Sequence, residues 1–183
     1  MTNGNMNGRV SLVGGKGFGL LAIALIVPLM SVGCDSAGKT HYNNGVAFIE
    51  KGLYQRAIEE LDKAIEIDPN YAAAYYKKGV SYNNLGEYQQ AIKEHDKAIN
   101  LDRKFIAMGL EPKNAVAYIG RGRAYFQVGR YGKAIESYGK AIDLDPDNAN
   151  AFQYRGISYR NLGQSTLADA DFTKACSLDR KYC

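Results

Sequence analysis

The hydrophobic and polar positions follow different patterns in two parts of the chain. Residues 18–30 form an uninterrupted apolar stretch, whereas from about residue 38 onward apolar residues recur with the period of a helix. In this second part a glycine is repeatedly followed, three residues later, by an aromatic residue. Three residues are close to one helical turn, so each pair lies on one helix face. The pairs are Gly45 with Phe48, Gly79 with Tyr82, Gly122 with Tyr125, and Gly156 with Tyr159.

The same pattern returns four times. The four glycines just named are separated by 34, 43 and 34 residues, and three further series of small residues keep these separations. Four series that share one spacing indicate four copies of one structural unit. The further series are Ala57, Ala91, Ala134 and Ala168; Ala64, Ala98, Ala141 and Ala175; and Gly52, Gly86, Gly129 and Gly163.

Each unit is expected to fold as two helices joined by a tight turn. The second glycine of the unit ends the first helix, because glycine adopts the left-handed cap conformation without a Cβ clash. In the second helix, small residues such as Ala134 and Ala141 flank the large Tyr138 and allow the helices to approach closely. The second helix ends at Asp-Pro in two units, at residues 68–69 and 145–146, because a residue before proline avoids helical geometry.

These residues resemble the tetratricopeptide repeat family, whose unit is a 34-residue helix-turn-helix. The resemblance covers residues 38–183 and implies an all-α array of four units. Departures from the family pattern are local: His41 and Asn44 in the first unit, Ser165 at a turn that elsewhere carries tyrosine, and arginine in place of the terminal proline in two units. The predicted units are residues 38–71, 72–105, 115–148 and 149–183.

Additional residues at 103–111 separate the second and third units. The segment RKFIAM contains no helix breaker, so the second helix of unit two is predicted to continue to about Met108, with Gly109 as its cap and Pro112 beyond it. The extension is interpreted as a ridge that contacts a partner through Phe105, Ile106 and Met108. The alternative is a spacer that changes the stacking angle.

The first 33 residues have the features of a secretory signal peptide. Arg9 and Lys16 are the only charges before Asp35, the apolar stretch follows them, and small residues come next. The uncharged span of residues 17–34 reaches the lower limit for a membrane helix, so an uncleaved anchor is the alternative. Both interpretations place the chain after Cys34 on the extracytoplasmic side.

The segment SVGC at residues 31–34 resembles the lipobox of bacterial lipoproteins. Gly33 and Cys34 fit, whereas Ser31 stands where leucine is usual and would suit an ordinary signal peptidase. The resemblance implies lipid attachment at Cys34 and a membrane-anchored protein of the cell envelope, on its periplasmic side. Lipidation would leave Cys176 and Cys183 as an even pair. A helix that ends near Leu178 to Arg180 would let the tail fold back into a disulfide; two free thiols are the alternative.

Other candidate chemistry is weak. The segment GCDSAGKT, residues 33–40, matches the nucleotide-binding P-loop pattern, but a P-loop follows a strand, and Lys39 and Thr40 are expected to begin the first helix of unit one. His41 and His95 lie at packing positions, and acidic pairs such as Glu59–Glu60 suit solvated helix faces. The net charge of +4 includes no basic run that would indicate a nucleic-acid partner. We expect no metal, no cofactor and no enzymatic activity.

In the family, the first helices of the units line a concave groove that binds proteins. Residues that could hold a terminal carboxylate, as in chaperone-binding members, are absent from the matching positions. The implied groove nevertheless has the aromatic, amide and arginine composition of a protein interface, although each residue could instead pack between units. We predict a membrane-tethered scaffold for a protein or peptide partner; a self-associating structural subunit, forming a homo-oligomer, is the alternative. The groove residues are Tyr42, Ile49, Tyr76, Asn83, Asn84, Ile119, Arg123, Phe126, Gln153 and Arg160.

Overall fold

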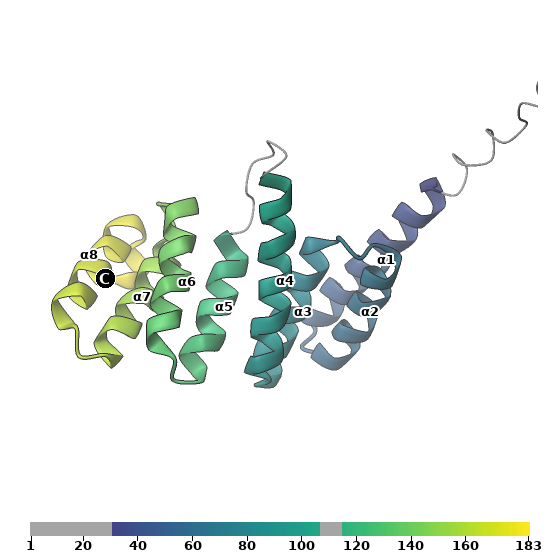
Figure 1. Cartoon of the computed structure of the whole chain (residues 1–183). Helices are drawn as coiled ribbons and strands as arrows, with labels where there is room; N and C mark the ends of the chain where they lie inside the picture. Colours follow the sequence, from purple (N-terminus) through teal and green to yellow (C-terminus); the bar gives the residue numbers. More distant parts are fainter. Residues whose placement is uncertain (1–30, 107–114) are drawn as a thin grey trace, which may run out of the picture.

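The computed structural model describes residues 31–106 and 115–183, with side chains for residues 37–102 and 115–183. In these ranges the chain forms eight helices and no strand, which confirms the all-α fold (Figure 1). The helices stand side by side in chain order, and each packs mainly on the one before and the one after it. They are α1 (Ser31–Glu50), α2 (Tyr54–Ile67), α3 (Ala72–Leu85), α4 (Tyr88–Ile106), α5 (Ala115–Gln127), α6 (Tyr131–Leu144), α7 (Ala149–Asn161) and α8 (Ser165–Leu178).

The turn inside each unit has the same geometry four times. Gly52, Gly86, Gly129 and Gly163 have φ between 72° and 78°, the left-handed conformation expected of them. In the third unit, the Gly129 N–H donates to the Phe126 carbonyl at 3.0 Å and the Arg130 N–H donates to the Tyr125 carbonyl at 2.9 Å. This pair of bonds satisfies carbonyls that the end of α5 would otherwise leave free.

Each pair of helices is held by a large side chain of the second helix packed on a glycine of the first. In the third unit, a Cβ atom on Gly122 would lie 2.6 Å from the ring of Tyr138. The alanines of the repeat are fully buried on either side of this contact, so the small residues are what allows the helices to approach. The equivalent contacts are Gly45 with Leu61, Gly79 with His95, and Gly156 with Phe172.

A polar contact joins the two helices of each unit at equivalent positions, and in the two middle units it extends to the preceding unit. In units two and three, a cation on the first helix bonds to the second helix of its own unit and to that of the preceding unit. Lys78 contacts Glu94 at 3.4 Å and Asp62 at 2.7 Å. Arg121 donates to Ser137 at 3.1 Å and to Asp96 at 2.8 Å. These contacts tie neighbouring units together.

The two end units depart from this pattern. Arg155 in unit four bonds Asp171 of its own unit through two contacts of 2.8 Å. In the preceding unit, Gly139 stands where units one and two have Asp62 and Asp96, so no second carboxylate is offered from that position.

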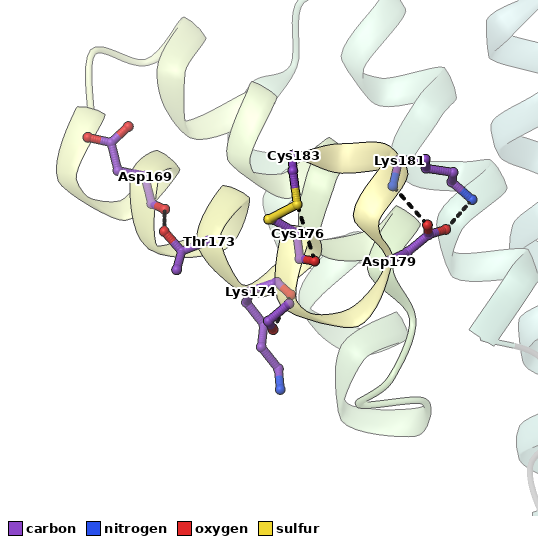
Figure 2. Close-up of a disulfide and its surroundings, with 8 residues drawn as sticks. Asp169, Thr173, Lys174, Cys176, Asp179, Lys181 and Cys183 are labelled. Atoms are coloured by element: carbon purple, nitrogen blue, oxygen red, sulfur yellow. Dashed lines mark hydrogen bonds and ion pairs between the residues drawn. A yellow bond between two sulfur atoms is a disulfide. The ribbon is translucent and has the colours of Figure 1, made fainter.

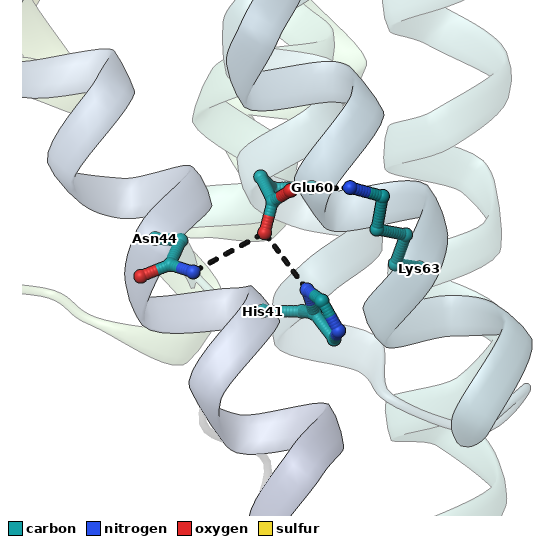
Figure 3. A network of polar contacts seen from close by, with 4 residues as sticks. All are labelled: His41, Asn44, Glu60 and Lys63. Atoms are coloured by element: carbon teal, nitrogen blue, oxygen red, sulfur yellow. Dashed lines mark hydrogen bonds and ion pairs between the residues drawn. The ribbon is translucent and has the colours of Figure 1, made fainter.

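In unit one Asn44 replaces the cation, and Glu60 is the centre of a polar network (Figure 3). Glu60 accepts from His41 Nδ1 at 2.8 Å, from Asn44 at 3.2 Å and from Lys63 at 2.6 Å. The hydrogen bonds from Lys63 and His41 lower the pKa of Glu60 to about 2. The expectation of a solvated helix face is therefore wrong for Glu60, which links α1 to α2.

Helix α1 begins earlier than the sequence indicates. We expected it to begin at Lys39 and Thr40, but the backbone is helical from Ser31. No proline interrupts this stretch, and Gly38 is buried against Ile67 of α2, which gives the added turns a packing partner. Residues 33–40 therefore lie inside a helix and do not form a phosphate-binding loop.

The extension of α4 is present as far as the structure describes it. Helix α4 continues to Ile106, five residues past the point equivalent to the end of α2, and it projects beyond α3 and α5 (Figure 1). Met108, Gly109 and Pro112 lie outside the described residues, as do the side chains of Phe105 and Ile106. Within the described ranges, no helix has the length and apolar character needed to cross a membrane. The predicted signal segment at residues 1–30 lies outside them.

The chain turns back after α8 (Figure 2). The short 3-10 helix η1 (Arg180–Tyr182) follows Leu178, and a disulfide joins Cys183 to Cys176 with the two Cα atoms 4.7 Å apart. The Asp179 carboxylate accepts from the Lys181 N–H at 3.0 Å and stabilises the turn. The Tyr182 hydroxyl donates to Asn150 Oδ1 at the start of α7. This arrangement supports the predicted pairing of the two cysteines.

Candidate protein-interaction groove

A cavity of about 320 Å³ opens where the first helices of units two, three and four lie next to one another. Its walls come from α3, α5 and α7 and from the turn that precedes α7. We call this cavity the central groove. It is lined by Tyr76, Val80, Asn83, Asn84, Val116, Ile119, Gly120, Arg123, Asn148, Asn150 and Tyr154.

The structure brings half of the ten predicted groove residues into this cavity and places the other half elsewhere. Tyr76, Asn83, Asn84, Ile119 and Arg123 line the central groove. The remaining five lie outside it. Tyr42 packs on Tyr71 with tilted rings, Ile49 packs against the cluster around Leu61, Phe126 contacts Tyr131, Arg160 lies over Phe172, and Gln153 has a buried side-chain oxygen.

Asn83 has a fixed orientation in the groove wall. Its side-chain nitrogen donates to the Gly120 carbonyl at 3.0 Å and lies 3.2 Å from His95 Nε2. Both N–H groups of the amide are directed to these acceptors, which identifies the remaining atom as the oxygen. Asn83 Oδ1 is buried and has no hydrogen-bond partner among the described residues.

His95 lies beneath Asn83 and is fully buried. It fits between two glycines, because a Cβ on Gly79 or Gly120 would lie 2.7 Å or 2.5 Å from the ring. Burial, with a smaller contribution from the charges of Arg121 and Arg123, lowers the pKa of His95 to about 3. The ring is therefore neutral at physiological pH, and its Nε2 can accept the hydrogen bond from Asn83.

Among the described residues, Arg123 is the only charged one that lines the groove. It is exposed, and its guanidinium forms no ion pair within the described part of the chain. Tyr76 and Tyr154 also line the groove, and Tyr154 stacks on the buried Tyr138 with ring centroids 5.9 Å apart. Burial raises the pKa of Tyr76, so this side chain is a neutral donor and acceptor.

Beyond the five predicted residues, the groove is lined by six others: Val80, Val116, Gly120, Asn148, Asn150 and Tyr154. Asn148 and Tyr154 show what signal the sequence carried for such residues. Asn148 is the N-cap of α7 and accepts from the Ala151 N–H at 3.1 Å, and Tyr154 reaches the groove from the middle of α7. Asn148 carried a usable signal, because an asparagine directly before a helix commonly caps it. Tyr154 carried none, because its position in the unit is occupied by Asn43, Lys77 and Gly120 in the other three.

The groove has the chemistry of a binding surface. It offers amide groups, aromatic faces and one arginine, a composition typical of protein interfaces. The described residues that line it include no histidine, cysteine or carboxylate that could act as a base or nucleophile. In the described ranges, no group of three or more His, Cys, Asp or Glu residues is placed to hold a metal ion.

Comparison with solved structures finds proteins of the same architecture. A structure titled "Crystal structure of MamA" superposes with a TM-score of 0.70 at 31% identity, covering 82% of this chain and 83% of that one. MamA from Desulfovibrio magneticus RS-1 gives a TM-score of 0.66 at 30% identity, covering 79% and 76%. PilF of Pseudomonas aeruginosa gives 0.69 at 25% identity, covering 81% and 64%. Comparison with curated proteins gives no significant match.

Protein-family comparison agrees with the repeat units. The family described as TPR repeat matches residues 45–86 and 122–163, and the one described as tetratricopeptide repeat matches residues 72–105 and 149–182. Together these matches cover all four units, and the fold, the recurring glycines and the structural neighbours agree with them. The chain belongs to the tetratricopeptide repeat family.

Proposed function

We propose that this protein is a non-catalytic scaffold that binds a protein or peptide partner through the central groove. The observation that carries the proposal is the groove itself, in which three consecutive units present amides, tyrosines and an exposed arginine, with no ion pair among the described residues, around one cavity. Proteins built from these repeats generally bind other proteins, which supports the assignment by analogy at the level of the fold. The groove chemistry supports it independently.

We further propose that the scaffold is tethered to a membrane of the bacterial cell envelope through lipid on Cys34, facing the periplasm. The support is the sequence alone: two cations, an apolar stretch and the SVGC segment. Because the backbone is already helical at Cys34, the lipidated residue would lie at the start of the first helix of the array. The array would then be held close to the membrane surface.

The anchor is tested by Cys34→Ala in the full chain, with Cys183→Ala as a matched control that also replaces one cysteine. We expect Cys34→Ala to abolish incorporation of radiolabelled palmitate and to prevent lipoprotein-type processing, while the control stays labelled and in the membrane fraction. A Cys34→Ala protein that is processed and fractionates like the wild type would show that the lipid assignment is wrong.

A second candidate is a structural subunit that self-associates through its last unit. The observation in its favour is the exposure of two large apolar residues there, Leu162 at 46% and Leu167 at 49%.

Site-specific photocrosslinking in cells separates the two candidates. A photoreactive residue replaces Asn84 in the groove or, as a control, the exposed Gln90 on α4. We expect a discrete adduct with another protein from position 84 and none from position 90. An adduct of twice the chain mass formed from a photoreactive residue at Leu167 alone would favour self-association. No adduct at position 84 would contradict groove binding.

A further inference from the structure

The central groove shares one wall with the residues that follow α8. We call residues 179–183 the tail. Asn148 and Asn150, at the start of α7, line the groove, and they also line a second cavity of about 500 Å³ that separates them from the tail. Asn148 is fixed within its own turn, because its amide caps α7 and bonds Asp145. Asn150 is fixed by the tail instead, since its Oδ1 accepts from the Tyr182 hydroxyl. One side chain of the groove wall therefore depends on the position of the tail.

The disulfide between Cys176 and Cys183 is what keeps the tail in this position (Figure 2). Most of the tail is exposed, so it buries little apolar surface. The two bonds between Asp179 and Lys181 lie within the tail and do not attach it to the array. Apart from the disulfide, the tail is attached mainly through the Tyr182 hydrogen bond. Ordering a segment of this length costs more free energy than one such bond returns, so without the disulfide the tail leaves α7.

The disulfide lies where a reductant can reach it. Cys183 is exposed and Cys176 is half-buried, and exposed disulfides are the ones that exchange readily. A thiolate of a dithiol reductant attacks the Cys183 sulfur, forms a mixed disulfide and releases the Cys176 thiolate. The second thiolate of the reductant then releases Cys183. The protein gains two electrons and two protons as two thiols, and the reductant leaves as a disulfide.

We propose that the tail is a redox-operated latch that regulates the central groove. In the disulfide form, Tyr182 holds the Asn150 amide in the groove wall; in the dithiol form, the tail leaves and Asn150 becomes mobile. A side chain that is already fixed loses less entropy when a partner binds, so the disulfide form binds the partner of the groove more tightly, by about fivefold. This inference rests on the proposed function and adds the regulation of its site.

The first test follows the latch in the full chain without a partner. The side-chain amide resonance of Asn150 is recorded by NMR in the disulfide form and after reduction with dithiothreitol. We expect this resonance to shift on reduction, while that of Asn70, on the turn between units one and two, stays in place. Tyr182→Phe should produce the shift with the disulfide intact, and the control Tyr54→Phe should not. A disulfide that dithiothreitol does not reduce in the folded chain, or an Asn150 resonance that reduction leaves unchanged, would overturn the latch.

The second test measures the groove in cells, with the photoreactive residue at position 84 as the probe. Treatment of the cells with dithiothreitol should lower the yield of the adduct by about fivefold. The variant Cys176→Ser/Cys183→Ser should give the low yield with and without reductant. Tyr182→Phe should also give it, although its disulfide is intact, and Tyr54→Phe should behave like the wild type. A reductant effect that persists in the double serine variant would place the redox step in another protein and overturn the proposal.

The remaining outcomes separate this inference from the proposed function. Equal adduct yields in the disulfide and dithiol forms would overturn the latch and leave groove binding intact. A low yield in the double serine variant together with a wild-type yield in Tyr182→Phe would show that the disulfide acts through the stability of the last unit, and would overturn the role of Asn150. No adduct at position 84 in either form, with the Asn150 resonance still responding to reduction, would contradict groove binding itself and its regulation.

Discussion

His95 shows how one residue can change the properties of a repeated position. At this position the second helix of each unit places a large side chain on a glycine of the first helix. In the other three units, the atoms of leucine, tyrosine or phenylalanine that face the glycine are all carbon. Histidine has a similar volume but can take up a proton. Because burial lowers the pKa of His95 to about 3, folding and protonation of this residue oppose each other.

We predict that His95→Leu reduces the acid sensitivity of the fold. Between about pH 7.5 and about pH 5 the unfolded chain gains a proton at residue 95, whereas the folded chain stays neutral there until the pH approaches 3. The wild type should therefore lose about 2 kcal/mol of unfolding free energy through this group, and the variant should not. Urea unfolding of both proteins at the two pH values measures the difference. His41 is common to both; an equal loss in both would contradict the prediction.

Helix α6 contains a glycine at the position where α2 and α4 carry the aspartate that binds a cation of the next unit. It carries glycine at positions 132 and 139, which weakens a helix, and Gly139 also interrupts this series of polar contacts. Lys78 and Arg121 each form an ion pair with a carboxylate of the preceding unit, whereas Arg155 forms its ion pair with Asp171 of its own unit. A Cβ built on Gly139 would lie 3.8 Å from the Arg155 guanidinium. The contact between α6 and α7 is therefore open to improvement.

We predict that Gly139→Asp stabilises the protein by about 1 kcal/mol, partly by removing a glycine from a helix and partly by giving Arg155 a second carboxylate. Gly139→Asn is the matched control, since it has the same shape and no charge. The aspartate should exceed the asparagine by about 0.5 kcal/mol, and about 1 M salt should remove this difference. If the two variants are equally stable at low salt, the added ion pair does not form.

The whole molecule is a linear array, and its stability is expected to be a sum over neighbouring units. Its last unit has a neighbour on one side only within the described chain. At that end Cys176 stands where the other units have Ile65, Ile99 and Ile142. Ile65 and Ile99 pack in the clusters that join their units to the first helix of the next unit. The disulfide holds Cys183 and the short turn against this face, so the tail covers part of the surface on which a further helix would pack.

We predict that the double variant Cys176→Ser/Cys183→Ser lowers the free energy of unfolding by about 2 kcal/mol, since the disulfide closes a short loop in the unfolded chain. The loss should be local, because units interact mainly with their neighbours. Hydrogen exchange should accelerate in α7 and α8 and remain unchanged in α1 and α2. The wild type in reductant should behave like the variant; uniform acceleration along the chain would contradict the local model.

The sequence by itself determined the repeat architecture. Small residues at fixed separations mark the faces on which two helices pack closely, and the glycine at each turn adopts a conformation that other residues avoid. The repetition of both features was sufficient to predict eight helices in four units. The cysteine pair and the end of α8 could also be anticipated. Turns, helix ends and a nearby cysteine pair depend on interactions between residues a few positions apart, so the sequence alone is enough to predict them.

Tertiary structure alone decided which residues form the groove and which polar groups are paired. Tyr42 occupies the same position of its unit as Tyr76, and Phe126 the same position as Asn83. Tyr42 and Phe126 nevertheless pack on Tyr71 and Tyr131 and lie outside the cavity. Glu60 became the centre of a network, and Asn83 was oriented by a histidine on α4 and a carbonyl on α5. Each of these outcomes depends on the angle and distance between helices, which the spacing of residues along one helix does not contain.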